Sequence, residues 1–263
     1  KGFYFTLKND SYVSKYETER INGTEIKETW LRGKVLGGST TVNGMMYLRG
    51  NKTAFDKLGA NTQKDYWGWD NFSAAYKQIE NHSLAETETR GNNGPLGVSI
   101  IKSEDIAAHK LISSAEDIGW AFTEDVNEGD NERIGFTPAT IKNGLRVSAS
   151  NAFLSKASKR KNLKIITNAT VAKILFEQKT ARGVVVSMKN KTVYFECRKE
   201  VLVCAGTVET PALLERSGIG HPDHLKSINI ETISESPYLG ENVIEHRGVS
   251  VQVKFKEEIG LNK

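Results

Sequence analysis

The sequence predicts a mixed fold, an α+β chain that ends in an α/β unit. Three observations predict it: helical periodicity over residues 70–80 and 105–117, four closely spaced β-rich runs within 163–197, and an apolar strand that leads through glycine into a helix over 200–216. The chain has 263 residues, of which 38% are hydrophobic and 26% charged, as in ordinary globular proteins. This length allows one large domain or two small ones.

Charge and hydropathy exclude two classes of partner. The net charge of +4 is small and dispersed, so we expect no nucleic-acid partner. No apolar run approaches the roughly 18 residues that a membrane-spanning helix needs, so we expect no membrane span. The one basic cluster lies where a predicted helix ends, and a solvated helix terminus explains it. Its members are Lys156, Lys159, Arg160, Lys161 and Lys164.

Apolar spacing and capping residues predict three helices before residue 160. They run over 70–80, 105–117 and 148–158, with Asp70 and Ser148 as the expected N-caps of the first and third. The first 34 residues are polar, with β-like stretches at 3–6 and 29–31.

The β-rich runs of the second half are separated by only a few residues, which predicts antiparallel hairpins. They cover 163–167, 171–176, 183–188 and 193–197. The continuous apolar run 200–205 is typical of a strand buried on both faces of a parallel sheet, so we interpret Cys204 as a buried small hydrophobic residue. A helix is predicted over 211–216, ended by Ser217-Gly218.

The segment most informative about function is Val35–Leu48, fourteen residues that carry no charge. Its adjacent glycines allow the backbone to approach a ligand and leave N–H groups free to bind oxygen atoms. Ser39 and Asn43 lie four residues apart, and both can hydrogen-bond the polar edge of a ring. A Gly-Gly-Ser turn that leads into a buried helix, with no ligand, is equally consistent with these residues.

Other chemical motifs are absent from the sequence. There is no G-x-G-x-x-G, Walker A, H-E-x-x-H, G-x-S-x-G or paired C-x-x-C. His221 and His224 have no accompanying Cys or acidic cluster, so we interpret them as a surface turn rather than a metal site.

The compartment is indicated by asparagine rather than by the two cysteines. The pattern N-x-Ser/Thr occurs at seven positions where composition predicts about three, which favours a secreted or lumenal glycoprotein. An Asn-rich chain whose sites stay unmodified is the alternative. No secretory signal lies within residues 1–29. The seven positions are Asn9, Asn22, Asn51, Asn71, Asn81, Asn168 and Asn190.

Two long stretches carry a family resemblance. Gly33–Gly50 resembles the first signature of the GMC (glucose–methanol–choline) family of flavin oxidoreductases, and Gly206–Gly220 resembles the second. The similarity continues over nearly the whole chain, at Tyr66–Asp70, Gly94–Leu96, Arg146-x-Ser148, Asn162–Leu163, Arg182–Val184 and Gly240–Asn242. It implies an FAD-binding Rossmann-like (GMC-type) domain, incomplete, with part of a substrate-binding domain.

The resemblance also implies a partition of the chain. Residues 1–50 would form the FAD-binding loop and a helix start, and 51–140 a lid or substrate-side insertion. Residues 141–221 would form the FAD-binding domain, with a β-meander and a strand–helix unit, and 222–263 the start of the substrate domain.

Eight cofactor-binding residues follow from the same resemblance. Seven match the loop and helix start beside the FAD pyrophosphate and isoalloxazine: Val35, Gly38, Ser39, Asn43, Gly44, Met45 and Met46. The eighth, Val171, matches a residue whose backbone holds the adenine. The His that attaches flavin covalently in some members is replaced by Val42-Asn43, so we expect non-covalent FAD.

The implied function is FAD-dependent oxidation of the CH–OH group of an alcohol by hydride transfer to flavin. The partners would be a small-molecule alcohol and an electron acceptor, with no metal. No catalytic residue is assigned, because the family's ADP-binding strand–glycine–helix would precede Lys1 and its His pair would follow Lys263. His246 is interpreted as structural. We therefore expect an internal portion of a longer protein that is inactive by itself.

Two alternatives stay open. An FAD-containing hydroxynitrile lyase uses the same fold without net redox chemistry. A truncated, non-catalytic family member would bind nothing.

Overall fold

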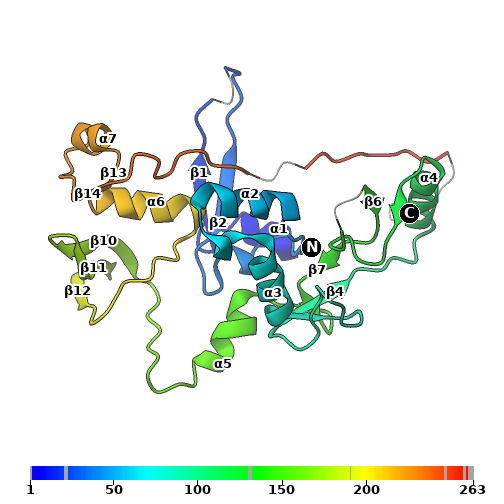
Figure 1. Cartoon of the computed structure of the whole chain (residues 1–263), viewed down its shortest axis with the longest axis horizontal. Coiled ribbons are helices and arrows are strands. Elements are labelled where there is room, and N and C mark those ends of the chain that lie inside the picture. The colour runs from blue at the N-terminus through cyan, green and yellow to red at the C-terminus, as the bar shows by residue number, and fades with distance from the viewer. Residues whose placement is uncertain are drawn as a thin grey trace. The chain divides into compact units, whose positions relative to one another are not determined.

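The computed structural model describes residues 2–20, 23–129, 132–189, 191–245, 248–256 and 259. The chain divides into two compact units: unit 1 comprises Lys1–Leu163 with Lys254–Lys263, and unit 2 comprises Lys164–Val253. Figure 1 labels most of their elements. The functional partition expected from the sequence stays a prediction.

Unit 1 begins with a short helix and a two-stranded ribbon. Helix α1 spans Gly2–Leu7, and β1 (Val13–Glu17) pairs antiparallel with β2 (Thr29–Gly33). The predicted strand at 29–31 is confirmed, and the one at 3–6 is wrong. A strand needs a partner for its backbone groups, whereas a helix satisfies them internally, and no described strand pairs with 3–6.

Two of the predicted helices are confirmed with small changes at their ends. Helix α3 spans Trp69–Ile79 and α4 spans Ile106–Asp117. Asp105, the first residue of the predicted range, caps α4, since its carboxylate accepts the Ala107 N–H at 2.9 Å. Asp70 is not a cap, because it lies inside the first turn of α3, where its charge favours the helix dipole.

The sequence did not predict α2 (Lys52–Thr62), which is capped by Asn51. It packs on α3 through Phe55 and Phe72, whose ring centroids lie 4.0 Å apart. The short η2 (Asp65–Trp67) joins the two helices.

The predicted helix over 148–158 is present, but its first turn is a π-helix, which is wider than an α-helix. A π-helical turn, η3 (Ser150–Leu154), leads into α5 (Ser155–Ala157). Ser148 caps it reciprocally with Asn151: the Asn151 N–H donates to Ser148 Oγ, and the Ser148 hydroxyl donates to Asn151 Oδ1.

Short strands complete unit 1. β3 lies parallel to β4, β4 antiparallel to β7, β5 parallel to β6, and β8 and β9 form a hairpin. Their bounds are β3 Glu80–His82, β4 Leu96–Ile100, β5 Ala121–Phe122, β6 Arg133–Ile134, β7 Pro138–Ala139, β8 Ile141–Lys142 and β9 Leu145–Arg146.

Unit 2 contains the predicted antiparallel meander, in the order β10-β11-β12. Helix α6 packs on β10, and α7 connects β13 to the parallel β14. The bounds are β10 Thr170–Glu177, β11 Thr180–Met188, β12 Lys191–Glu196, α6 Gly206–Arg216, β13 Ile219–Gly220, α7 Pro222–Ser227 and β14 Ser234–Glu235.

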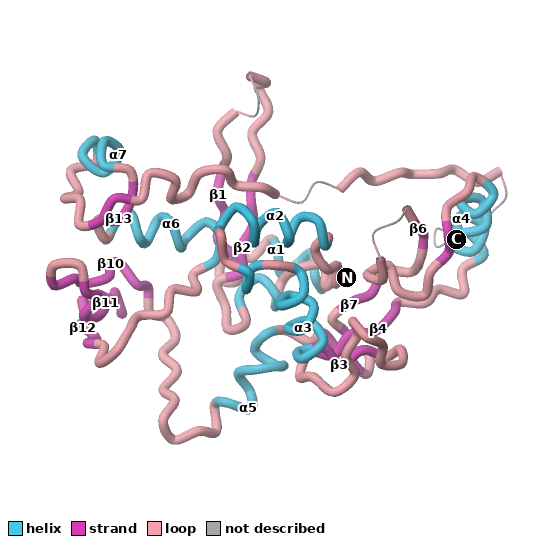
Figure 2. Tube along the Cα trace, viewed as in Figure 1, coloured by secondary structure: helices cyan, strands magenta, loops and turns pink. Residues whose placement is uncertain are grey.

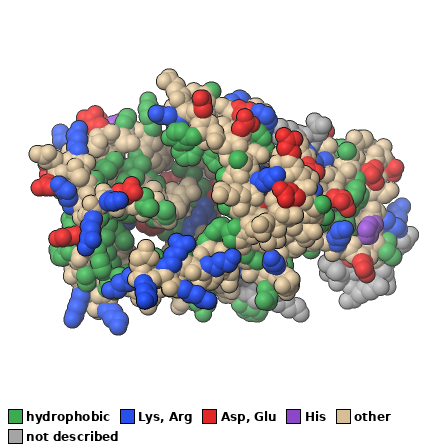
Figure 3. Space-filling model, turned by 60° about the horizontal axis from the view of Figure 1, so that its bottom comes forward, with side chains coloured by type: hydrophobic (Ala, Val, Ile, Leu, Met, Phe, Trp, Pro, Cys, Tyr) green, Lys and Arg blue, Asp and Glu red, His purple; other side chains and the backbone are tan. Residues whose placement is uncertain are grey.

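Two strand predictions are wrong, one where the two units join and one within unit 2. Residues 163–167 and 201–205 are loop (Figure 2). Leu202 is 76% exposed and Cys204 is exposed, so the interpretation of Cys204 as buried is also wrong. An apolar run becomes a buried strand only between neighbouring strands, and no described strand pairs with either segment. Hydrophobic side chains accordingly reach the surface in Figure 3.

The helix and meander of unit 2 are joined by one buried side chain. Ser217, fully buried at the end of α6, donates its hydroxyl to the Leu213 carbonyl and accepts the Ile174 N–H of β10 at 2.9 Å. The hydroxyl thus satisfies one backbone group on each element.

We predict that Ser217→Ala destabilises unit 2 by about 1–3 kcal/mol, because it leaves the buried Ile174 N–H without an acceptor. Chemical unfolding followed by circular dichroism measures this. Ser187→Ala, on the exposed face of β11, is the matched control and should change stability little. Equal effects of the two substitutions would contradict the role of Ser217.

Candidate functional site

The uncharged segment 35–48 forms a tight loop at the end of β2. Gly37 and Gly38 both have positive φ, 88° and 56°, and they lead into a single 3-10 turn, η1 (Gly38–Thr41). A Cβ on Gly37 would lie 2.6 Å from Thr41 Oγ1, so packing within the loop requires glycine there. The expected helix start is only this one turn, followed by the 2.8 Å bond from the Asn43 N–H to the Ser39 carbonyl.

Ser39 closes the loop on itself. Its Oγ accepts the Gly33 N–H at 3.0 Å, and its carbonyl accepts the N–H groups of Val42 and Asn43. The residue is exposed, so its hydroxyl proton can still be donated outward.

Asn43 is held by two donors. Its Oδ1 accepts the Met45 N–H at 3.1 Å and Arg146 Nη1 at 2.9 Å. Because both contacting groups are donors, the oxygen of the Asn43 amide faces them and its NH₂ group points the other way. In the described part of the chain, Nδ2 has no hydrogen-bond partner, and the residue is exposed.

Gly44 differs from the other glycines of the loop. Its φ is not positive, and a Cβ placed on it would meet no atom within 4 Å in any described residue other than its two chain neighbours. Its N–H makes no backbone hydrogen bond to any described residue. The chain's own packing therefore gives no reason for glycine at this position.

The residues after Gly44 return the loop to the body of unit 1. Met45 has a left-handed φ of 66°, and its carbonyl accepts the Thr140 N–H at 2.9 Å. Met46 bridges to Ala139 and is 62% exposed. The Tyr47 N–H then donates to Pro138. Met45 thus keeps a costly conformation because its neighbours on both sides are tied down.

These observations place six of the eight predicted residues on one loop with an accessible side. Gly38, Ser39, Asn43, Gly44, Met45 and Met46 lie between η1 and the bridge to Ala139. Val35 is half-buried at the start of the loop. Val171 is half-buried on β10 in unit 2, and its contact with adenine stays a prediction.

The loop fits a flat ligand whose edge carries hydrogen-bond acceptors. Gly38 and Gly44 both face open space, where a Cβ would otherwise stand. Asn43 Nδ2 and the Gly44 N–H are donors without partners among the described residues. The isoalloxazine ring of FAD has this shape and such an edge.

Sequence reasoning missed a buried ion pair behind the loop. Arg49 Nη2 lies 2.5 Å from Glu80 Oε2, and both side chains are almost fully buried. Glu80 also accepts the Gly91 N–H, and Arg49 stacks on the Tyr76 ring with its Cζ 5.5 Å from the centroid. Burial, together with the Glu80 charge, raises the pKa of the Tyr47 hydroxyl beside this pair. The sequence contained one signal for this ion pair: Arg49 is the first charged residue after the uncharged segment.

A second buried pair adjoins the first. Arg90 Nη1 lies 2.9 Å from Asp125 Oδ2. His82 Nδ1 accepts the Leu84 N–H, so the proton of the neutral ring lies on Nε2, which is 3.9 Å from Asp125 and makes no hydrogen bond to a described residue. Burial lowers the pKa of His82, with Asp125 and Glu80 opposing the shift and Arg90 and Arg49 adding to it. His82 is thus neutral near pH 7.

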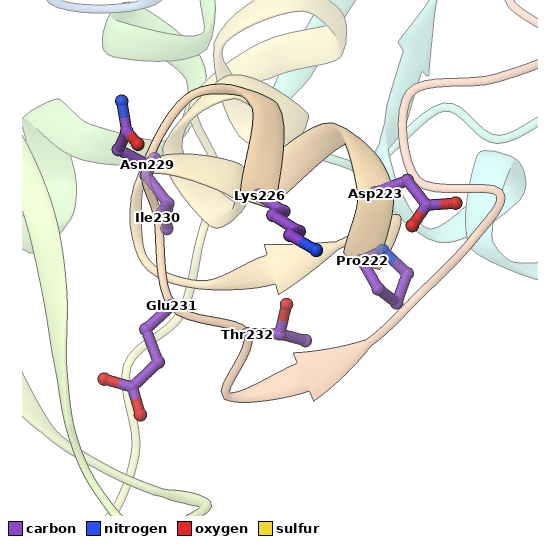
Figure 4. A pocket seen from close by; sticks show the side chains of 7 residues that line it. All are labelled: Pro222, Asp223, Lys226, Asn229, Ile230, Glu231 and Thr232. Carbon is purple, nitrogen blue, oxygen red and sulfur yellow. The ribbon is translucent and has the colours of Figure 1, made fainter.

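A cavity of about 490 Å³ lies in unit 2, between α7 and the segment that follows it (Figure 4). None of the predicted cofactor residues lines it. Its lining residues are Pro222, Asp223, Lys226, Asn229, Ile230, Glu231 and Thr232.

The described residues include no group of three His, Cys, Asp or Glu side chains that could hold a metal ion. They also include no helix long and apolar enough to cross a membrane. His246 lies outside the described residues.

Comparison with known proteins gives consistent results. A family model described as GMC oxidoreductase matches residues 20–247. The chain is 36% identical over 234 residues to oxygen-dependent choline dehydrogenase 1 of Chromohalobacter salexigens, and 35% identical over 260 residues to the oxygen-dependent choline dehydrogenase of Brucella anthropi. These alignments cover 88% and 98% of this chain but 41% and 47% of the relatives, so the chain spans less than half their length.

Solved structures agree on the fold. The crystal structure of pyridoxine 4-oxidase from Mesorbium loti matches with a TM-score of 0.83 and 29% identity, over 90% of this chain and 47% of that one. A formate oxidase matches with a TM-score of 0.78 and 25% identity, over 89% and 42%. The fold class expected from the sequence is confirmed. These relatives are described as dehydrogenases and oxidases, which gives the hydroxynitrile lyase alternative no support.

We predict that the free energy of unfolding falls as the pH is lowered below about 6.5, the pKa of an unfolded His. Because the folded-state pKa of His82 is depressed, the unfolded chain binds the proton first, and stability is fully present only above this range. His82→Asn, which retains an acceptor for the Leu84 N–H, should reduce the slope below about pH 6.5 by up to about 1.4 kcal/mol per pH unit.

Denaturant titrations at several pH values measure these slopes. His221→Asn, at an exposed position whose side chain has no ion pair or hydrogen bond to a described residue, is the control against which the slope of His82→Asn is compared. An unchanged slope in His82→Asn would show that other groups cause the acid sensitivity.

Proposed function

The chain belongs to the GMC oxidoreductase family, and from this premise we propose that the protein is an FAD-dependent oxidoreductase that oxidises the CH–OH group of a small-molecule alcohol. The observation that carries the proposal is the loop 38–46. It combines glycines that face open space with donors that have no partner among the described residues. Neither feature serves the chain's own packing.

The names of the relatives support an alcohol as the substrate. Two are choline dehydrogenases, and a structural relative is a pyridoxine 4-oxidase. Choline and pyridoxine both carry a CH–OH group. The second partner is an electron acceptor, either dioxygen or another oxidant.

The chain's own residues would bind and orient the cofactor. Bound FAD would supply the acceptor for a hydride from the alcohol carbon, as flavins do in such enzymes. Asn43 and Gly44 would donate hydrogen bonds to the ring edge, and Gly38 would allow the backbone to approach it. Val35, Ser39, Met45 and Met46 complete the proposed contact, and Val171 would hold the adenine through its backbone.

We propose that FAD is held without a covalent bond. Val42, at the place where the family's attaching His would stand, is 4% exposed and has no nucleophilic atom. Asn43, the next residue, carries an amide that is not nucleophilic and is already engaged by Met45 and Arg146.

We further propose that the protein is secreted and glycosylated. The support is the exposure of four of the sequence's acceptor sites, Asn9, Asn51, Asn71 and Asn168. Asn168 lies in a loop with φ 52°, and its side chain forms no hydrogen bond to a described residue. In contrast, Asn81 is half-buried in β3, between β4 and a bridge to Asn92.

We predict that Gly44→Val weakens FAD binding to the full-length protein by about tenfold or more, equivalent to about 1.4 kcal/mol, without lowering the melting temperature of the FAD-free protein. The added side chain meets no atom of the chain near its Cβ but fills the proposed ligand space. Visible flavin absorbance after equilibration with FAD measures the binding. Gly248→Val, at another glycine with open surroundings, is the control.

If wild-type protein shows no flavin absorbance, the proposed function is wrong. If Gly44→Val binds FAD as tightly as the wild type, the loop is not the ring-binding element.

We predict that Asn168→Gln removes one glycan from protein secreted by a eukaryotic host, whereas Asn81→Gln removes none. An oligosaccharyltransferase needs an accessible acceptor, and Asn168 is exposed in a loop, whereas Asn81 is half-buried in β3. Gel mobility before and after treatment with a glycosidase measures the number of glycans. Absence of any glycosidase-sensitive shift in the secreted wild type would contradict glycosylation.

A further inference from the structure

Arg146 touches the candidate site from outside the loop. Its Nη1 donates to the Asn43 Oδ1 at 2.9 Å and to the Thr40 carbonyl at 3.1 Å. The residue is positioned by the β8–β9 hairpin, where it pairs with Ile141, and the next residue, Val147, bonds to Thr140. One nitrogen of the Arg146 guanidinium thus binds two residues that precede it by more than 100 positions in the sequence.

No acidic side chain among the described residues pairs with Arg146. Its hydrogen bonds there are to a neutral amide and a carbonyl, and partial burial is the cause that lowers its pKa. It stays charged at any physiological pH. A positive charge that is partly desolvated and has no carboxylate partner creates a positive potential at the loop.

The guanidinium also fixes how the Asn43 amide points. Oδ1 faces two donors, the Met45 N–H and Arg146 Nη1. If the amide were turned over, its NH₂ group would face both donors, and two hydrogen bonds would become repulsive contacts. The Nδ2 donor is therefore held outward, beside the open Gly44.

We infer that Arg146 is a positioning residue for the flavin ring, acting through Asn43. It locks the amide with its donor outward and adds a positive charge, so the loop selects a ligand edge that bears acceptors and negative charge density. The carbonyl and imine edge of the isoalloxazine ring has this chemistry. This inference rests on the proposed function, but it assigns a role to a residue that makes no contact with the ligand.

The test uses the full-length protein and FAD itself. Arg146→Gln should raise the FAD dissociation constant about tenfold or more, because small losses of orientation in a binding site have effects of this size. Arg146→Lys, which keeps the charge and one donor, should restore part of the loss. Lys142→Gln is the matched control: it removes the same charge from an exposed position on the same hairpin and should leave FAD binding unchanged.

A second variant separates binding from folding. Asn43→Asp keeps the acceptor for the Met45 N–H and gives Arg146 a carboxylate partner, so we expect a melting temperature equal to or above that of the wild type. The outward donor becomes an acceptor, so FAD binding should weaken about tenfold or more. A purely structural role of Arg146 and Asn43 would not produce this opposition of stability and affinity.

A double-mutant cycle decides whether Arg146 acts through Asn43. Arg146→Gln and Asn43→Ala should together weaken FAD binding by clearly less than the sum of their separate effects. Additive losses, or unchanged affinity in Arg146→Gln while the wild type binds FAD, would overturn the inference and leave the proposed function standing. Failure of the wild type to bind FAD would instead overturn the proposed function. A shift in the visible absorption of bound FAD in Arg146→Gln is the independent readout.

Discussion

The buried contact between Arg49 and Glu80 is the interaction on which the rest of unit 1 depends. It joins the end of the uncharged loop to the start of β3, and Glu80 continues the connection to the Gly91 N–H. Removing one partner of a buried pair costs about 3–5 kcal/mol, because the other charge is left without compensation. The segment that Glu80 contacts also has a local sequence requirement. Close packing brings residues 91 and 94 so near to the carbonyl groups of α3 that a Cβ at either would lie about 2 Å from them.

The anchoring of the loop at Tyr47 and Arg49 affects the preceding residues 38–46. Asn127 bridges the Tyr47 carbonyl and the Arg49 N–H, and Pro138 accepts the Tyr47 N–H. With this end anchored, and Arg146 holding Asn43, the loop keeps its donors in place before any ligand arrives. Preorganised donors do not lose orientational freedom on binding, which favours affinity. In the proposed function, this rigidity would hold the flavin ring in one orientation.

The glycines of the loop fall into two kinds. Gly33 and Gly37 are required by the chain itself, since a Cβ on either would lie within 2.6 Å of another atom of the loop or its neighbours. Gly38 and Gly44 face open space. Both kinds look alike in the sequence. A Gly-Gly pair shows that the backbone can adopt unusual conformations, but it does not show whether another atom lies where a side chain would be. The distance from a built Cβ to its neighbours therefore separates glycines that the chain's packing requires from glycines that leave room for a ligand.

The sequence by itself determined the elements whose stabilising contacts are local. The helices α3 and α4 followed from apolar spacing and first-turn residues, and the β10-β11-β12 meander followed from short connections between β-rich runs. It also determined the family and the loop that carries the candidate site, through two long signatures. It failed at 163–167 and 200–205, where apolar composition predicted strands that have no described partner.

Only the tertiary structure decided which side chains meet across long sequence distances. Arg49 meets Glu80 and Arg146 meets Asn43 although nothing in their spacing links them, because such contacts depend on how separate elements pack. A strand likewise depends on neighbours that its own residues do not specify. Local patterns are encoded within a few residues, whereas buried ion pairs and the direction of an amide are set by the folded chain as a whole.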